Sequence, residues 1–335
     1  MTHHLPAPIS TSLAQVGQVA NTYASQNVFT DYQGRISANT LRRQADDLAL
    51  FSYYLAATGV VIEANDLLHD PTSWHGITYG LVDSFVRWML AEGYAIGSVN
   101  VRLSTIKVYC KLVAKSGVLP PAEYALIRLV TGYRHAEGRN IDQRRGTVRK
   151  GDKKAVAVSI TSAQSTRLKS QPDTPQGYRD ALLMCLLLDL GFRCGEVAAL
   201  TPDVLNLDEG TLVLYREKVD KTQTHKLTAD ALEAAKRYLL ACQPSGRLLM
   251  GSRKGGKLQG VMSTRAITDR VKVLGEQIGI EGLSAHDCRH YWATSAVKGG
   301  TDIRSLQDAG GWSSPAMPLR YAEAGRVANE GVKLG

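Results

Sequence analysis

Side chains that could do chemistry are concentrated in four short motifs in the second half of the chain. They are GFRCGE at 191–196, REKVDKTQTHK at 216–226, HDCR at 286–289 and GGWSSPAMPLRY at 310–321. Together they supply guanidinium and ammonium groups, which bind anionic oxygens, and a histidine and a tyrosine, which can exchange protons. Each motif alone also has an ordinary explanation, such as a surface ion pair, a soluble hairpin tip or aromatic packing.

The order and spacing of these motifs resemble the signature of the tyrosine recombinases, also called the phage integrase family. That family places Arg, Lys, His-x-x-Arg, His or Trp, and Tyr in this order. The corresponding positions here are Arg193, Lys218, His286, Arg289, Trp312 and Tyr321. Most members carry His at the fifth position, and the Trp found here is shared with Cre-like members. The resemblance covers residues 155–321, and none of the motifs is missing.

The resemblance implies an enzyme that cleaves and rejoins DNA strands through a 3′-phosphotyrosine intermediate. Tyr321 would attack the phosphorus, and Arg193 and Arg289 would bind the non-bridging oxygens through charge-assisted hydrogen bonds. Because a free phenol has a pKa of roughly 10, a base is needed, and His286 is the family's candidate. Trp312 would donate its indole N–H to a phosphate oxygen.

The resemblance also assigns a general acid and a supporting residue. Lys218 would protonate the 5′-hydroxyl leaving group, although Lys221 in the same hairpin remains the alternative. Glu196 would orient Arg193 or the neighbouring helix. The sequence contains no Walker motif, carboxylate cluster or zinc-ligand spacing, so no cofactor and no metal are predicted.

Two other functions remain open at the level of the sequence. A type IB topoisomerase shares this active site and would relax DNA strands instead of exchanging them. An architectural DNA-binding protein would bend or occlude a site without cutting it. Covalent trapping on nicked DNA separates the second alternative from both enzymes.

The elements that must position these motifs are predicted to be mainly helical. The predicted fold class is mainly α, an all-helical core-binding domain followed by a mixed α/β, mostly helical, catalytic domain with a small antiparallel sheet. In the first half, apolar residues at steps of three and four predict helices from residue 39 to Gly59 and at 78–92, 98–115 and 121–130. In the second half, the predicted elements are strands at 155–159, 211–216 and 222–227 and helices at 177–190, 194–200, 228–241, 263–278, 286–298 and 301–310.

The predicted domain organisation has four parts. Residues 1–36 are polar and lack strong periodicity, which predicts an extended N-terminal arm. Residues 37–130 form the helical core-binding (SAM-like) DNA-binding domain. Residues 131–154 form a basic linker, and residues 155–335 form the catalytic domain with its C-terminal tail.

The charge distribution indicates a polyanionic partner. The chain carries a net charge of +9, and residues 131–154 alone hold 8 basic and 3 acidic side chains. Such a concentration of positive charge is typical of nucleic-acid binding, with a solvated basic surface as the alternative. The predicted DNA-contact residues are Lys107, Lys111, Arg144, Arg145, Arg149, Arg265 and Lys272.

The predicted partner is double-stranded DNA with paired recombination half-sites. Strand exchange between two duplexes implies a homotetramer on synapsed DNA and a monomer or weak oligomer without it. By resemblance, the tail after Tyr321 would reach a neighbouring subunit, with Val327 as its apolar anchor. The longest apolar run has 8 residues, at 181–188, too short to span a bilayer, so no membrane partner is expected. The expected location is the cytoplasm, for a bacterial or phage-encoded protein that is associated with the nucleoid.

Overall fold

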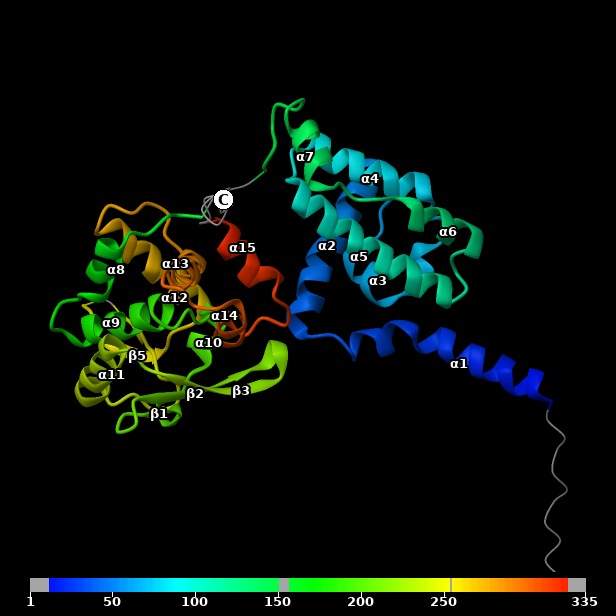
Figure 1. The fold of residues 1–335 in the computed structure, drawn as a ribbon. Coiled ribbons are helices and arrows are strands. Elements are labelled where there is room, and N and C mark those ends of the chain that lie inside the picture. Colours follow the sequence, from blue (N-terminus) through cyan, green and yellow to red (C-terminus); the bar gives the residue numbers. More distant parts are fainter. Residues whose placement is uncertain (1–11, 151–156, 254, 325–335) are drawn as a thin grey trace, which may run out of the picture. The chain divides into compact units, whose positions relative to one another are not determined.

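The computed structural model describes residues 12–150, 157–253 and 255–324, apart from the side chains of 218 and 324, and divides the chain into two compact units (Figure 1). The first unit is Met1–Lys153 and the second is Lys154–Gly335. Each unit has its own large cluster of buried apolar side chains. Among the described residues, no helix is both long and apolar enough to cross a membrane.

The first unit is all-helical, as predicted. Its elements are α1 Leu13–Gln33, α2 Ala38–Ala57, α3 Ala64–His69, the 3-10 helix η1 Pro71–Trp74, α4 Tyr79–Ala91, α5 Ile96–Lys115, α6 Pro121–Leu129 and α7 His135–Asp142. Helix α5 is central, because it packs against α1, α2, α4 and α6. The apolar stripe predicted on this helix is buried, and its members are Val99, Leu103, Ile106, Cys110 and Val113.

The structure differs from the predicted arm at residues 1–36. Residues 1–11 lie outside the described residues, but 13–33 form a helix that begins with a capping box between Ser12 and Gln15. Only the second half of this helix enters the core, where Val28 and Phe29 are buried and Phe29 meets Tyr109 edge to face. The first half leaves Leu13, Val16, Val19 and Tyr23 exposed, so the helix has no continuous buried face for a hydrophobic pattern to reveal.

The structure also differs at the predicted linker of residues 131–154. Helix α7 occupies 135–142, and Arg145 binds the carbonyl oxygens of Leu90 and Tyr94 at 3.2 and 2.8 Å. Residues 131–150 therefore belong to the first unit. Helix α7 is short and polar, and its close approach to Ile96 is made at Gly138, so it carries no apolar stripe to detect.

The second unit is mostly helical with two small antiparallel sheets. Its helices are α8 Ser162–Lys169, α9 Pro175–Leu188, α10 Cys194–Ala199, α11 Ala229–Cys242, α12 Thr264–Glu276, α13 Ala285–Lys298, α14 Ile303–Gly310 and α15 Ala316–Ala324, with 3-10 helices Pro202–Val204 (η2) and Glu217–Val219 (η3). Its strands are β1 Leu205–Asn206, β2 Thr211–Arg216, β3 Lys221–Lys226, β4 Met250–Ser252 and β5 Leu258–Val261. The predicted strand at 155–159 is partly outside the described residues, and residues 157–159 are not a strand.

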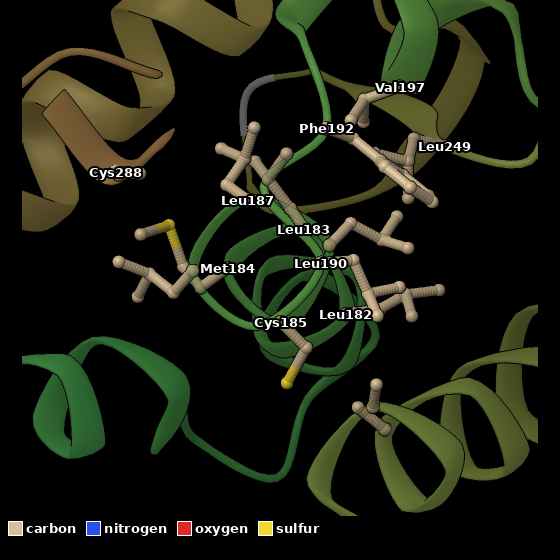
Figure 2. Close-up of a cluster of buried hydrophobic side chains, with 14 of the residues drawn as sticks. Leu182, Leu183, Met184, Cys185, Leu187, Leu190, Phe192, Val197, Leu249 and Cys288 are labelled. Carbon is tan, nitrogen blue, oxygen red and sulfur yellow. The ribbon is translucent and has the colours of Figure 1, made fainter. Parts of the chain in front are cut away.

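Helix α9 forms the centre of the second unit (Figure 2). Residues 182–188 are all buried, around the whole circumference of the helix, which is the pattern of a helix covered on every side. It packs against α8, α11 and α13. The chain leaves α9 through Gly191 and buried Phe192, and this exit places Arg193 at the start of α10.

The larger sheet has the strand order β1-β2-β3, and β2 pairs with β3 from Thr211–Lys226 to Arg216–Lys221. Alternate side chains of β2 face the core, so Leu212 and Leu214 are buried. Arg216 continues the same alternation and is also buried, at 1% exposure.

A buried ionic cluster joins α9 to α12 and β4. The carboxylate of Asp180 accepts two hydrogen bonds from Arg179 on one oxygen, at 2.9 and 2.6 Å, and two from Arg270 on the other, at the same lengths. Arg179 also donates to the carbonyl oxygen of Met250 at 2.8 Å. Asp180 and Arg179 are almost completely excluded from solvent, so each charge depends on the others for compensation.

We expect Asp180→Asn to lower the free energy of unfolding of the second unit by about 3–5 kcal/mol, because it leaves two guanidiniums without their carboxylate. Native-state hydrogen exchange of the α9 amides measures this change. The control is Glu233→Gln, which breaks an exposed ion pair with Arg237 and should cost less than about 1 kcal/mol. Equal effects of the two substitutions would contradict this account of the cluster.

Candidate active site

Arg193 and Arg289 reach the same place, the C-terminal end of α14. Arg193 begins α10, and its Nη2 donates to the carbonyl oxygen of Gly311 at 2.9 Å. Arg289 lies on α13 and donates to the carbonyl oxygens of Gly191 at 2.5 Å and Gly310 at 2.6 Å. The structure thus brings together two residues that are 96 positions apart in the chain.

A third guanidinium, which the sequence analysis did not identify, binds the same segment. Arg216 donates to the carbonyl oxygen of Ala309 at 2.8 Å and to that of Gly310 at 3.0 Å. The last carbonyl groups of a helix lack partners within the helix and carry partial negative charge. Three consecutive carbonyls, at 309, 310 and 311, therefore hold three arginines.

Two glycines make this approach possible. A Cβ on Gly311 would lie 2.5 Å from Cδ of Arg216, and Gly311 has a φ of +59°, in the left-handed region. A Cβ on Gly310 would lie 2.0 Å from the ring of Trp312. Both glycines of the GGW motif are thus required by space, and Gly311 also by backbone conformation.

Glu196 supplies the negative charge at this cluster. Its Oε1 accepts hydrogen bonds from Nη1 of Arg193 at 2.7 Å and from Nη1 of Arg216 at 3.0 Å. Its Oε2 accepts from the backbone N–H of Arg193 at 2.8 Å, which completes the first turn of α10. The predicted Arg193–Glu196 pair is present, and one carboxylate is shared by two guanidiniums.

The guanidinium of Arg289 is enclosed by aromatic rings. It lies 4.4 Å from the centroid of Trp312 and 5.8 Å from that of Trp292, and these two indoles stack at 6.0 Å. Such contacts stabilise a cation that has lost most of its water. Burial lowers the pKa of Arg289 to about 10, so this side chain remains charged at neutral pH.

Tyr321, on α15, completes the cluster. It is buried at 4% exposure, and its ring centroid lies 5.8 Å from that of Trp312. Burial raises the pKa of Tyr321, while the positive charges of Arg289, Arg320 and Arg193 act in the opposite direction. The phenol is therefore protonated at neutral pH and must lose its proton to act as a nucleophile.

The histidine beside Tyr321 is His290, one residue after the predicted motif. Its ring meets the Tyr321 ring edge to face, with 5.0 Å between centroids. His286 lies exposed in the first turn of α13. Burial, with the nearby charge of His286, lowers the pKa of His290, so His290 is neutral at pH 7 and could accept a proton.

The two candidate lysines, Lys218 and Lys221, lie at the turn of the β2–β3 hairpin. The Lys218 side chain lies outside the described residues, and its backbone belongs to η3. Lys221 forms an ion pair of 2.5 Å with Asp308 on α14, and Gln223 donates to the carbonyl oxygen of Asp308 at 2.9 Å. These contacts fix β3 against α14, so Lys221 already has an internal partner.

The predicted DNA-contact residues of the first unit have different surroundings. Lys107 donates to the carbonyl oxygens of Arg128 and Val130, both at 2.8 Å, and Arg145 is bound internally as described above. Lys111 and Arg144 are exposed, and Arg149 is partly buried. The first unit therefore offers Lys111 and Arg144 to a ligand more readily than Lys107 and Arg145.

In the second unit, Arg265 and Lys272 lie on α12 with side chains 90% and 60% exposed. Each faces a carboxylate one helical turn later, Asp269 at 3.7 Å and Glu276 at 3.9 Å. Exposed pairs of this kind are weak, so both cations are available to an anionic ligand. The predicted tail begins within α15, and its residues from 325 on, Val327 included, lie outside the described residues.

Comparison with known proteins identifies relatives of this chain. The sequence pattern of the phage integrase family matches residues 159–326, half of the chain. The chain is 30% identical over 188 residues to tyrosine recombinase XerD of Neisseria meningitidis serogroup B, which covers 53% of this chain and 62% of that protein. It is 24% identical over 303 residues to XerD of Pseudomonas aeruginosa, covering 87% of this chain and 89% of that protein.

A solved structure shows the same fold. The lambda integrase tetramer bound to a Holliday junction aligns with a TM-score of 0.58 at 14% identity, covering 100% of this chain and 85% of that one. The alignment with the Neisseria relative spans less than two thirds of that protein. The alignments with the Pseudomonas relative and with lambda integrase span most of those chains.

The contacts of Tyr321 generate a prediction about its ionisation. Arg289→Met removes a positive charge that lowers the Tyr321 pKa, so we expect that pKa to rise further. Fluorine NMR of 3-fluorotyrosine placed at position 321 measures the titration directly in both proteins. Arg304→Met, on α14, serves as the control and should leave the titration unchanged. An unchanged or lower pKa in Arg289→Met would show that this arginine does not act on the phenol.

Proposed function

The chain belongs to the phage integrase family, and from that premise we propose that it is a site-specific DNA recombinase that works through a 3′-phosphotyrosine. The observation that carries this proposal is the meeting of Arg193, Arg289 and buried Tyr321 at the end of α14. A phosphodiester is anionic and repels nucleophiles, so a cationic pocket beside a nucleophile is what strand cleavage requires.

In the proposed first step, the scissile phosphate binds between the guanidiniums and Tyr321. Each guanidinium has five N–H donors, and among the described residues Arg193 and Arg289 each donate through two nitrogens, Nη1 and Nη2. Further donors thus remain for the non-bridging oxygens. Arg193, with a side chain 29% exposed, is the more accessible of the two, and Trp312 can add its indole N–H.

In the proposed cleavage step, the Tyr321 oxygen forms a bond to phosphorus and the bond from phosphorus to the 5′-oxygen breaks. The phenol proton passes to a base, for which the family resemblance suggests His286 and the ring contact suggests His290. Lys218 gives its proton to the leaving 5′-oxygen. Because the phosphotyrosine conserves the bond energy, a 5′-hydroxyl from a second duplex can reverse the step and complete strand exchange.

We further propose that the substrate is double-stranded DNA with paired half-sites, synapsed by four copies of the chain. The fold it shares with lambda integrase, solved as a tetramer on a Holliday junction, supports this assembly. The exposed cations Arg265 and Lys272 on α12 and Arg144 in the first unit are the proposed phosphate contacts. Acting on genomic or mobile DNA would place the protein in the cytoplasm.

We expect Tyr321→Phe to bind target DNA normally and to form no covalent complex, because only the nucleophilic oxygen is lost. Nicked DNA should stay attached to the parent protein, but not to this variant, through denaturing electrophoresis. Tyr215→Phe, which alters an exposed tyrosine of the same unit, should retain the complex. Covalent complex from Tyr321→Phe would refute the assignment, and strand relaxation without recombinant products would indicate a topoisomerase.

We expect Arg193→Ala and Arg289→Ala each to slow covalent-complex formation by at least about 3 kcal/mol of transition-state free energy, as for the loss of an oxyanion donor. Single-turnover cleavage at saturating DNA measures this effect separately from binding. A cleavage rate equal to that of the parent protein in either variant would remove that arginine from the mechanism.

The general acid is tested with a substrate that carries a 5′-bridging phosphorothiolate, because its leaving group departs without protonation. This substrate should restore cleavage by Lys218→Ala and leave Arg289→Ala impaired. Lys221→Arg should have a mild effect, because its pairing with Asp308 accepts either cation. Restoration of Lys221→Ala instead of Lys218→Ala would exchange the roles of the two lysines.

A further inference from the structure

We propose that Arg216 is a positioning residue of the strand-transfer reaction, which holds Glu196 and the end of α14 so that Arg193 and Arg289 face the phosphate. This inference rests on the proposed function. The position of Arg216 near the hairpin turn offers no signal of this role in the sequence, apart from its place on the core-facing side of β2.

Arg216 cannot itself bind the phosphate, because its side chain is 0% exposed. Its guanidinium is occupied by Glu196, by the carbonyl oxygens of Ala309 and Gly310, and by a contact of 3.4 Å with Nε2 of His225. It therefore acts on the reaction only through these neighbours.

The first route of action runs through Glu196. Because Oε1 of Glu196 accepts from both Arg193 and Arg216, its charge is divided between two cations. Without Arg216, the whole carboxylate charge would fall on Arg193 and compete with the phosphate for its donors. Arg216 thus keeps the guanidinium of Arg193 both oriented and electrostatically available.

The second route runs through α14. The carbonyl oxygen of Gly310 accepts from Arg216 at 3.0 Å and from Arg289 at 2.6 Å, so one acceptor fixes both guanidiniums. Gly310 also begins the turn that leads to Trp312, and the ring of Trp312 lies against Arg289. Loss of Arg216 would release one side of this turn and allow Arg289 and Trp312 to shift.

The placement of Arg216 is not the one that stability alone would favour. Burial lowers the pKa of its guanidinium, and among the described residues its Nε has no hydrogen-bond partner despite being buried. Removing one member of a buried ion pair is strongly destabilising when it leaves the other charge without compensation. Glu196 would stay paired with Arg193, so Arg216→Met should fold.

The test compares Arg216→Met and Arg216→Lys with the parent protein, by single-turnover covalent-complex formation on nicked DNA at saturating concentration. We expect cleavage by Arg216→Met to fall about tenfold to a hundredfold, the effect of a small misplacement of reacting groups. The affinity for DNA should be close to that of the parent protein, and the variant should remain folded at the assay temperature. Arg216→Lys should recover only part of the rate, because an ammonium lacks the guanidinium fork.

A double-mutant cycle with Glu196→Gln tests the first route. If Arg216 acts partly through Glu196, the two substitutions together should slow cleavage by less than the product of their separate effects. Lys236→Met, an exposed cation on α11, is the control and should leave cleavage unchanged.

Two results would overturn the inference while the parent protein still forms covalent complex. One is an unchanged cleavage rate in a folded Arg216→Met protein. The other is a loss of cleavage that is matched by a loss of folding in both Arg216 variants, with effects on the activation free energy that add to those of Glu196→Gln. A purely structural residue would behave in this way. Absence of covalent complex in the parent protein would instead refute the proposed function.

Discussion

The binding of three guanidiniums by the C-terminal end of α14 is the interaction on which the rest of the site depends. Like charges repel, so three arginines can gather only where negative charge compensates them. The carbonyls of residues 309–311 and the carboxylate of Glu196 provide that compensation. Because the cluster holds three guanidiniums and one carboxylate, it keeps a net positive charge suited to an anionic ligand.

Close packing in the rest of the second unit restricts the positions of the arginines and of Tyr321. Buried α9 leads through Gly191 to Arg193, and a Cβ on Gly191 would lie 2.2 Å from the ring of Trp292. Trp292 in turn stacks on Trp312, which contacts both Arg289 and Tyr321. A continuous series of contacts thus joins the segment that leaves α9 to the proposed nucleophile.

The site residues that lie in short sequence motifs could be predicted from the sequence. The resemblance to the tyrosine recombinases assigned Arg193, Arg289, Trp312 and Tyr321 to one site, and the structure brings these four residues together. Arg216 and His290 were missed, because their contacts with the cluster depend on residues that are distant in the chain and on the rotation of a helix about its axis. The alternation of buried and exposed residues along β2 places Arg216 on the core-facing side. A single arginine at such a position does not by itself indicate that it belongs to a functional site.

The differences in fold have similar physical causes. Helix α1 was not predicted because its apolar residues are not concentrated on one face: the first half lies outside the core and leaves Leu13, Val16, Val19 and Tyr23 exposed. Residues 131–150 contain α7 and pack through Gly138 and Arg145, neither of which has an apolar side chain that a hydrophobic pattern would record. Long amphipathic helices such as α5 were predicted with nearly their observed bounds, because their burial is periodic.

The central claim is that the positive charge at the end of α14 serves to neutralise the scissile phosphate. Replacing that phosphate by a methylphosphonate removes its negative charge and tests this claim directly. The measurement is the rate of covalent-complex formation by Arg193→Ala and Arg289→Ala on both substrates. The account predicts that the defect of at least one variant, relative to the parent protein, is much smaller on the methylphosphonate. Equal defects of both variants on the charged and the neutral substrate would contradict it.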